Sequence, residues 1–283
     1  MTDEPAAHAM GVDQPWILAF RWSGRLLVPA SWLSGVIFAA YILLFFGATV
    51  LRDEGSRWNE ALPGLFDPRT VIAATAIGLH FVAGGALLLL GPVQFIGRLR
   101  RSVPALHRWL GWLYVSSAGL AGIGGLAFIL NRGTIGGQVM DVGFGLYGIL
   151  MVGCAATTFV HARAGRYDRH RAWATRLFAL TVGSWLYRME YSLWYFLVDA
   201  SGGGAVRGGW LDAAMAFMFY IPNLLVAEAL IRARHGERGL VITVGAAALN
   251  VVASALVILA TWSYTAYVWG PGVLRGLTPV PGP

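Results

Sequence analysis

The stretch that decides the fold is VIAATAIGLHFVAGGALLLLGPVQFIGRLRRSVPALHRWLGWLYVSSAGLAGIGGLAFILNR, residues 71–132. Two long apolar runs flank a short basic segment that contains Arg98, Arg100 and Arg101. A helix of about 20 apolar residues crosses the hydrocarbon core of a bilayer, which is roughly 30 Å thick. The stretch therefore predicts two membrane-spanning helices that are joined by a basic turn at the membrane surface.

The composition of the whole chain also indicates a membrane protein. Of the 283 residues, 57% are hydrophobic and only 12% are charged, and the mean hydropathy is +0.62. Soluble domains carry about 25% charged residues, and disordered chains are poor in hydrophobic residues, so both classes are excluded. The single cysteine, Cys154, excludes a disulfide scaffold and a cysteine-rich metal site. The sequence predicts an all-α, polytopic integral membrane helix bundle.

Seven apolar stretches are long enough to cross the membrane. The segment that precedes them, residues 1–28, is expected to be a cytoplasmic N-terminus with an interfacial segment, because Trp, Phe and Arg are mixed there. Residues 269–283 are rich in Pro and Gly and are expected to form an irregular outer tail. The seven-helix transmembrane domain covers residues 29–268, with predicted spans at 29–51, 70–97, 104–131, 138–162, 170–198, 210–232 and 240–268.

The arginines predict the orientation of the chain. All 21 basic residues are arginine, and the net charge is +7. If the chain crosses seven times, fourteen of them fall on one side, six on the other, and Arg188 lies within a span. Cytoplasmic loops carry the excess of positive charge, so the N-terminus is expected inside and the C-terminus outside a bacterial inner (cytoplasmic) membrane. The expected partners are the bilayer and its anionic headgroups on the cytoplasmic side, and not nucleic acid.

Five polar side chains are expected in the central third of the bilayer. Residues of this kind are rare within spans, and they mark ligand sites, ion pathways or hydrogen-bond networks. Two of them are two residues apart on one helix, so they face different ways and each needs a partner on another helix. Pro222 is expected to kink the sixth span at the same depth. The midplane polar cluster consists of His80, Arg188, Glu190, Asn223 and Asn250.

A second group of candidate site residues lies at the cytoplasmic face. His107, His161 and His170 are at the inner ends of the third, fourth and fifth spans. His107 and His170 fall in first helical turns, where the helix dipole favours an anion. The eight arginines around them form a predicted anion and headgroup face: Arg98, Arg100, Arg101, Arg108, Arg166, Arg169, Arg171 and Arg176.

Three segments carry a resemblance to a known family. They are the stretch from His80 to Gln94, PALHRWLGWLY at residues 104–114, and HRAWATR at residues 170–176. Together they resemble the bacterial membrane family named domain of unknown function 2306, which has similar His-Arg motifs. The resemblance covers about residues 70–200 and implies a polytopic membrane architecture. It brings no established activity, and it does not include the sixth and seventh spans.

The most concrete functional hypothesis is a b-type haem protein that transfers electrons in the membrane. Histidines on four successive spans are similar to the layout of the two-haem cytochrome b family. His107, His161 and His170 are the candidate iron ligands in this hypothesis. His80 and Arg188 are further cofactor-binding candidates.

Two alternatives remain open beside the haem hypothesis. The first is a non-enzymatic membrane subunit, assembly or lipid-binding protein, which works with a partner of a membrane complex. The second is a proton-coupled transporter that uses His80, Arg188 and Glu190. The sequence contains no Ser/His/Asp arrangement, HExxH motif, P-loop or dinucleotide fingerprint, so no catalytic residue is assigned and a non-enzymatic role is favoured.

Overall fold

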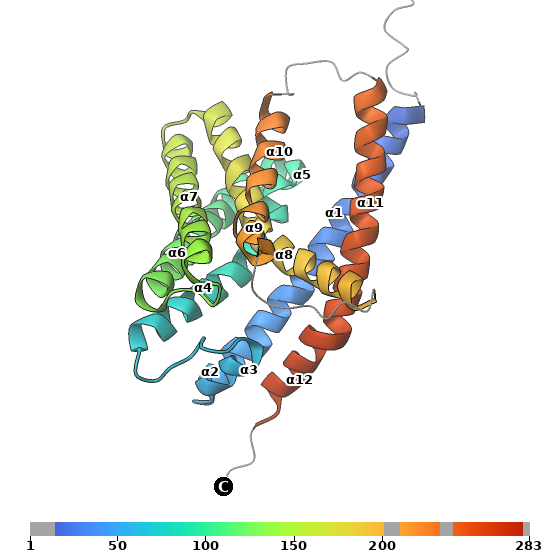
Figure 1. Cartoon of the computed structure of the whole chain (residues 1–283). Coiled ribbons are helices and arrows are strands. Elements are labelled where there is room, and N and C mark those ends of the chain that lie inside the picture. Colours follow the sequence, from blue (N-terminus) through green and yellow to red (C-terminus); the bar gives the residue numbers. More distant parts are fainter. Residues whose placement is uncertain (1–14, 201–209, 233–239, 280–283) are drawn as a thin grey trace, which may run out of the picture.

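The computed structural model in Figure 1 describes residues 15–200, 210–232 and 240–279. All regular structure within these residues is helical, which confirms the predicted all-α class. The longer helices are α1 (Pro15–Tyr41), α4 (Val71–Leu90), α6 (Pro104–Arg132), α7 (Gly137–Arg163), α8 (Tyr167–Ala200), α9 (Trp210–Met218), α10 (Ile221–Arg232) and α11 (Leu240–Tyr264). The short elements are the π-helix η1 (Ile42–Gly47), α2 (Ala48–Leu51), η2 (Gly55–Arg57), α3 (Trp58–Ala61), η3 (Pro92–Phe95), α5 (Gly97–Ser102), the π-helix η5 (Thr265–Trp269) and α12 (Gly270–Leu277).

Six segments of the described chain are long and apolar enough to span a membrane, as a multi-pass protein requires. Helix α8 is a further long helix that runs between them, and its charged residues make it less apolar (Figure 1). The bundle starts at the top of the view with α1 and ends at the bottom with α12, which fits seven passes. Which end faces the cytoplasm stays a prediction. The six segments are Pro15–Leu51, Val71–Phe95, Pro104–Arg132, Gly137–Arg163, Trp210–Arg232 and Thr243–Leu277.

The structure differs from the sequence prediction near both termini. The expected interfacial segment is the beginning of α1, which runs without a break from Pro15 to Tyr41. The expected irregular tail is wrong for residues 270–277, because these residues form α12. Pro271 is tolerated there since it occupies the first helical turn, where no intrahelical donor is lost. The remaining parts of both predictions, residues 1–14 and 280–283, lie outside the described residues.

The sixth span is broken at the position where Pro222 predicts a kink. Helix α9 ends at Met218 and α10 begins at Ile221, because Pro222 has no N–H to continue the helical ladder. The side chain of Asn223 donates from Nδ2 to the carbonyl oxygen of Phe219 at 2.7 Å. The amide therefore satisfies a carbonyl at the break that would otherwise face apolar surroundings.

Helix α8 takes part in two separate hydrophobic cores. Leu177 and Leu180 pack with buried side chains of α4, α6, α7 and the residues between α9 and α10. Further along, Trp185 and Met189 pack with residues of α1, η1, α4, α11 and η5. In lipid, helices associate mainly through such close packing and through interhelical hydrogen bonds. The same helix thus joins the two halves of the bundle, which Figure 1 shows on either side of it.

Hydroxyl groups connect α1 to α11 and to α8. The Ser34 hydroxyl accepts a hydrogen bond from Trp185 Nε1 at 3.0 Å and one from Thr261 Oγ1 at 2.6 Å. Nearer the start of α1, Asn250 Nδ2 donates to Ser23 Oγ at 3.2 Å. Side-chain hydrogen bonds between membrane helices contribute about 0.6–2 kcal/mol each. These contacts fix how α1 and α11 are rotated against each other.

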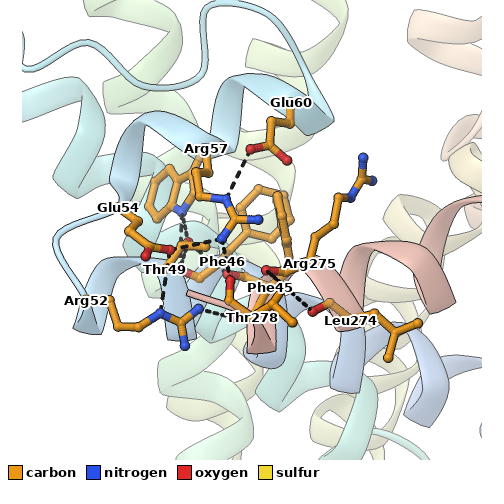
Figure 2. A network of polar contacts seen from close by, with 12 residues as sticks. Phe45, Phe46, Thr49, Arg52, Glu54, Arg57, Glu60, Leu274, Arg275 and Thr278 are labelled. Carbon is orange, nitrogen blue, oxygen red and sulfur yellow. Dashed lines mark hydrogen bonds and ion pairs between the residues drawn. The ribbon is translucent and has the colours of Figure 1, made fainter. Parts of the chain in front are cut away.

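A polar network connects the segment from the end of α2 through η2 to the end of α12 (Figure 2). Arg52 donates through Nη2 to the carbonyl oxygen of Gly276, and Arg57 donates through Nη1 to that of Thr278 at 3.0 Å. Glu54 accepts from Arg57 at 2.9 Å, and this hydrogen bond raises the pKa of the guanidinium. The last carbonyl groups of a helix lack intrahelical donors, and here the two arginines supply the missing hydrogen bonds.

Two glycines allow α12 to lie directly on η1. A Cβ atom at Gly276 would be 2.6 Å from the Cα of Phe45, and it would clash with the carbonyl oxygen of Leu44. A Cβ atom at Gly272 would be 3.0 Å from Cδ2 of the Tyr41 ring. The contact at Gly276 is with backbone, which cannot rotate away as a side chain can.

Replacement of Gly276 by alanine is expected to lower the free energy of unfolding by about 1–3 kcal/mol, because the new methyl group overpacks the contact with η1. Hydrogen exchange should become faster in residues 270–277. Denaturant unfolding in detergent and hydrogen–deuterium exchange of the purified protein measure the two effects.

The matched control is Gly245→Ala on α11, where a Cβ atom would meet no atom within 4 Å. This variant is expected to be neutral or to gain up to about 1 kcal/mol in helix propensity. Equal unfolding free energies for the two variants would contradict the proposed role of the glycine contact.

Candidate functional site

Three predicted histidines come together at the end of the bundle where α7 passes to α8, at the top of Figure 1. His107 lies in the first turn of α6, His161 in the last turn of α7, and His170 in the first turn of α8. His170 Nδ1–H donates to the carbonyl oxygen of Thr158 at 3.0 Å. His170 also lies within electrostatic range of both His107 and His161. Three helices therefore each contribute one histidine to the same polar end of the bundle.

Several buried polar atoms at this end have no hydrogen-bond partner among the described residues. They are Gln94 Nε2, His107 Nδ1, Thr158 Oγ1 and His161 Nδ1. Gln94 Oε1 is 3.2 Å from the Cβ position of Gly111, which is one helical turn after His107. Because buried polar atoms in proteins nearly always have a partner, this group indicates that water or a ligand completes it. We call Gln94, His107, Thr158, His161 and His170 the histidine cluster.

Positive charge surrounds the histidine cluster. Arg100 on α5 interacts electrostatically with His107, and Arg166 and Arg169 interact with His161. All three arginine side chains are exposed. An anion at this end would meet guanidinium groups from two connecting segments.

One arginine of the predicted headgroup face has a different role. Arg176 donates from Nε and Nη2 to Glu228 Oε2 at 3.1 and 2.6 Å, and its guanidinium stacks 4.8 Å from the Trp173 ring centroid. The ion pair ties α8 to α10 and neutralises this charge. The other members of the face form no ion pair within the described residues: Arg98, Arg100, Arg101, Arg108, Arg166, Arg169 and Arg171.

The histidine cluster and the surroundings of His80 differ in how well they suit a haem group. In the described chain, no set of three or more His, Cys, Asp or Glu side chains is arranged to hold a metal ion. Haem iron needs only one or two axial ligands, and His107 and His161 each present an unpartnered ring nitrogen on neighbouring helices. The cavity at His80, in contrast, measures about 30 Å³, whereas pockets for larger ligands measure about 300–1,000 Å³. The cavity at His80 is therefore too small for haem.

The predicted midplane residues His80 and Arg188 line one small cavity. His80 Nδ1–H donates to the carbonyl oxygen of Ala121 at 2.8 Å, so its ring is fixed by α6. The close approach of α6 to α4 depends on Gly124, because a Cβ atom there would lie 2.6 Å from the carbonyl oxygen of Ala76 on α4. The cavity of about 30 Å³ is lined by Phe38, Ile42, His80, Phe81, Gly84, Leu88, Ser184 and Arg188.

The other three midplane residues lie elsewhere. Glu190 Oε2 is buried and has no hydrogen-bond partner among the described residues. Asn223 donates to Phe219 O on its own span, and Asn250 donates to Ser23 Oγ on α1. Within the described residues, no hydrogen bond or ion pair joins any of these three side chains to His80 or Arg188. The five residues predicted at one depth therefore do not form a single cluster of contacts among the described residues.

Two members of the histidine cluster, Gln94 and Thr158, are not among the sequence-based candidates. Gln94 stands at the end of an apolar run, just before the basic turn, which is a weak signal for a functional amide. Thr158 is 2% exposed and lies one helical turn before His161. A threonine inside a span carries no distinctive signal, because its hydroxyl usually bonds to its own helix.

The comparisons with known proteins place this architecture in a family. A family model described as predicted membrane protein (DUF2306) matches residues 77–231, which is more than half of the chain. No curated protein and no solved structure matches. The match includes the histidine cluster, His80 and Arg188, and it extends through α10, so the sixth span belongs to the family region, contrary to the sequence-based expectation. The chain belongs to the DUF2306 family of predicted membrane proteins.

Proposed function

We propose that this protein is a lipid-binding membrane protein without a catalytic role, and that its histidine cluster holds the headgroup of an anionic phospholipid. The group of unpartnered buried polar atoms carries the proposal. The Gln94 amide and the Thr158 hydroxyl can donate hydrogen bonds, as can the protonated nitrogens of His107 and His161. Phosphate oxygens accept several hydrogen bonds at once, and these bonds are strong because the acceptor is charged.

The start of α6 supports an anionic ligand at the same place. The residue before this helix, Val103, makes no side-chain cap, and His107 lies in its first turn. Free N–H groups and the helix dipole favour a negative group at such a helix end. The exposed arginines nearby add about 1 kcal/mol each of attraction to an anionic membrane surface. Because anionic lipids are concentrated in the cytoplasmic leaflet, the proposal agrees with the expected N-in orientation in a bacterial inner membrane.

Replacement of His161 by alanine is expected to weaken binding of a short-chain phosphatidylglycerol about tenfold, because one hydrogen bond to a charged group is lost. Delipidated protein in a zwitterionic detergent is titrated with the lipid, and bound lipid is counted by native mass spectrometry. Phosphatidylcholine, which has no net charge, is expected to bind more weakly.

Arg232→Gln serves as the matched control, since Arg232 is an exposed arginine on α10 that already contacts Glu228 at 3.2 Å. Its phosphatidylglycerol affinity should stay close to that of the wild type. If both variants bind the lipid as tightly as the wild type, the headgroup does not occupy the histidine cluster.

A b-type haem is the second candidate ligand of the same cluster. The gathering of three histidines at one end of the bundle favours it, since His107 and His161 lie on the neighbouring helices α6 and α7 and both are within electrostatic range of His170. When bound, haem would supply one-electron redox chemistry. The two histidines would hold the iron, and the exposed arginines would neutralise the propionates. Electron transfer in the membrane would then be the function.

The absorption spectrum of protein from haem-supplied cells tests this candidate. A bound haem is expected to give a Soret band and, after dithionite reduction, a sharp α-band. His107→Ala and His161→Ala should each lose the bands, and Arg69→Gln, on the opposite end, should keep them. Aromatic absorbance alone in the wild type would exclude haem. Unchanged bands in both histidine variants would show that His107 and His161 do not hold the iron, and would leave the lipid as the ligand of the cluster.

A further inference from the structure

Arg188 carries a positive charge into the interior of the bundle. Its Nη1 donates to the carbonyl oxygen of Ser184 on the same helix at 3.1 Å. Its Cζ atom lies 4.9 Å from the centroid of the Phe38 ring on α1, which is a cation–π contact. Neither partner carries a negative charge, so both contacts solvate the guanidinium without balancing it.

The described residues supply no carboxylate to Arg188. None of the six ion pairs in the described chain includes it. Glu190 is close in sequence, but residues two apart project from different sides of a helix. Arginine remains protonated in proteins, so the charge cannot be removed by loss of a proton. An unbalanced charge in an apolar interior is costly by several kcal/mol, and a counter-ion from solution would remove this cost.

The cavity beside Arg188 has the size for such an ion. Its volume of about 30 Å³ exceeds the roughly 10–15 Å³ that a cavity needs to hold one water molecule. It therefore admits a monatomic ion or a molecule of very few atoms, and excludes sugars, nucleotides and amino acids. The apolar side chains in its lining, which include Phe38 and Phe81, would favour a weakly hydrated ion over a multiply charged one.

Two further polar groups line the cavity. The Ser184 hydroxyl makes a long hydrogen bond, 3.3 Å, to the carbonyl oxygen of Thr181, and it also interacts with the Tyr147 side chain. A hydroxyl can rotate, so it can turn to donate to a ligand. His80 uses Nδ1 for Ala121, which leaves Nε2 as its remaining polar atom. A bound ion would thus meet the Arg188 guanidinium and the Ser184 hydroxyl, with the His80 ring and apolar side chains around it.

We propose that Arg188, Ser184 and the cavity between α1, α4 and α8 bind a small monovalent inorganic anion, such as chloride or bromide. The bound anion balances the charge of Arg188 and links the family region to α1, which lies outside the family match. This site is independent of the histidine cluster, and it stands whether that cluster holds a lipid, a haem or neither.

Thermal unfolding of the full-length protein in detergent tests the proposal. Sodium bromide replaces sodium gluconate at constant ionic strength, and tryptophan fluorescence follows unfolding. Because only the folded state binds the ion, the Tm should rise saturably, by about 5 °C when bromide exceeds its Kd about a hundredfold. Gluconate and sulfate, which do not fit the cavity, should give no such rise. Absence of a bromide-specific rise in the wild type overturns the proposal.

Two variants locate the site, and a third is the control. Arg188→Gln removes the charge and should abolish the bromide effect. Gly84→Ala keeps the charge but narrows the cavity, and a Cβ atom at Gly84 meets nothing within 4 Å, so this variant should fold and still lose most of the effect. Arg69→Gln, an exposed arginine at one end of the bundle, should retain it. A full bromide effect in Gly84→Ala, or in a folded Arg188→Gln, overturns the proposal; if Arg188→Gln does not fold, Gly84→Ala decides alone.

Discussion

Helix α8 carries two charged residues, Arg188 and Glu190, along a stretch where the helices of both halves of the bundle pack against it. Its less apolar sequence sets it apart from the six segments that meet the length and hydropathy of a span. The helix is stable there because other helices surround it: Leu177 and Leu180 belong to one core and Trp185 and Met189 to another. The two halves of the protein are arranged around this helix, so its burial governs which surfaces are left for lipid.

Most of the fold could be predicted from the lengths of apolar runs. The third and fourth spans were expected at 104–131 and 138–162, and the helices run from Pro104 to Arg132 and from Gly137 to Arg163. Hydropathy missed the beginning of α1 and the whole of α12, because the arginines, glycines and prolines there lower the average. In the folded protein these segments are stabilised by tertiary contacts, such as Gly276 against η1, which no local pattern contains.

The depth of the candidate site residues along their helices could be predicted from the sequence, but their contacts could not. Counting residues along a span gives the level of a side chain, and the three histidines at helix ends do lie at one level. The direction of each side chain depends on helix rotation, which the sequence does not show. For this reason His80 contacts Ala121, whereas Glu190 Oε2, predicted at a similar depth, has no hydrogen-bond partner among the described residues. Glycines such as Gly124 decide these rotations, because they determine which helix faces can approach.

The pairing of α1 with α11 has a consequence for how the protein is made. Hydroxyls of α1 at Ser23 and Ser34 find their partners on α11 more than 200 residues later in the chain. During synthesis α1 enters the bilayer long before Asn250 and Thr261 have left the ribosome. In that interval its polar groups must rely on their own backbone, on transient neighbours or on the insertion machinery. The family region can assemble first, and the bundle closes only when α11 arrives and takes up position beside α1.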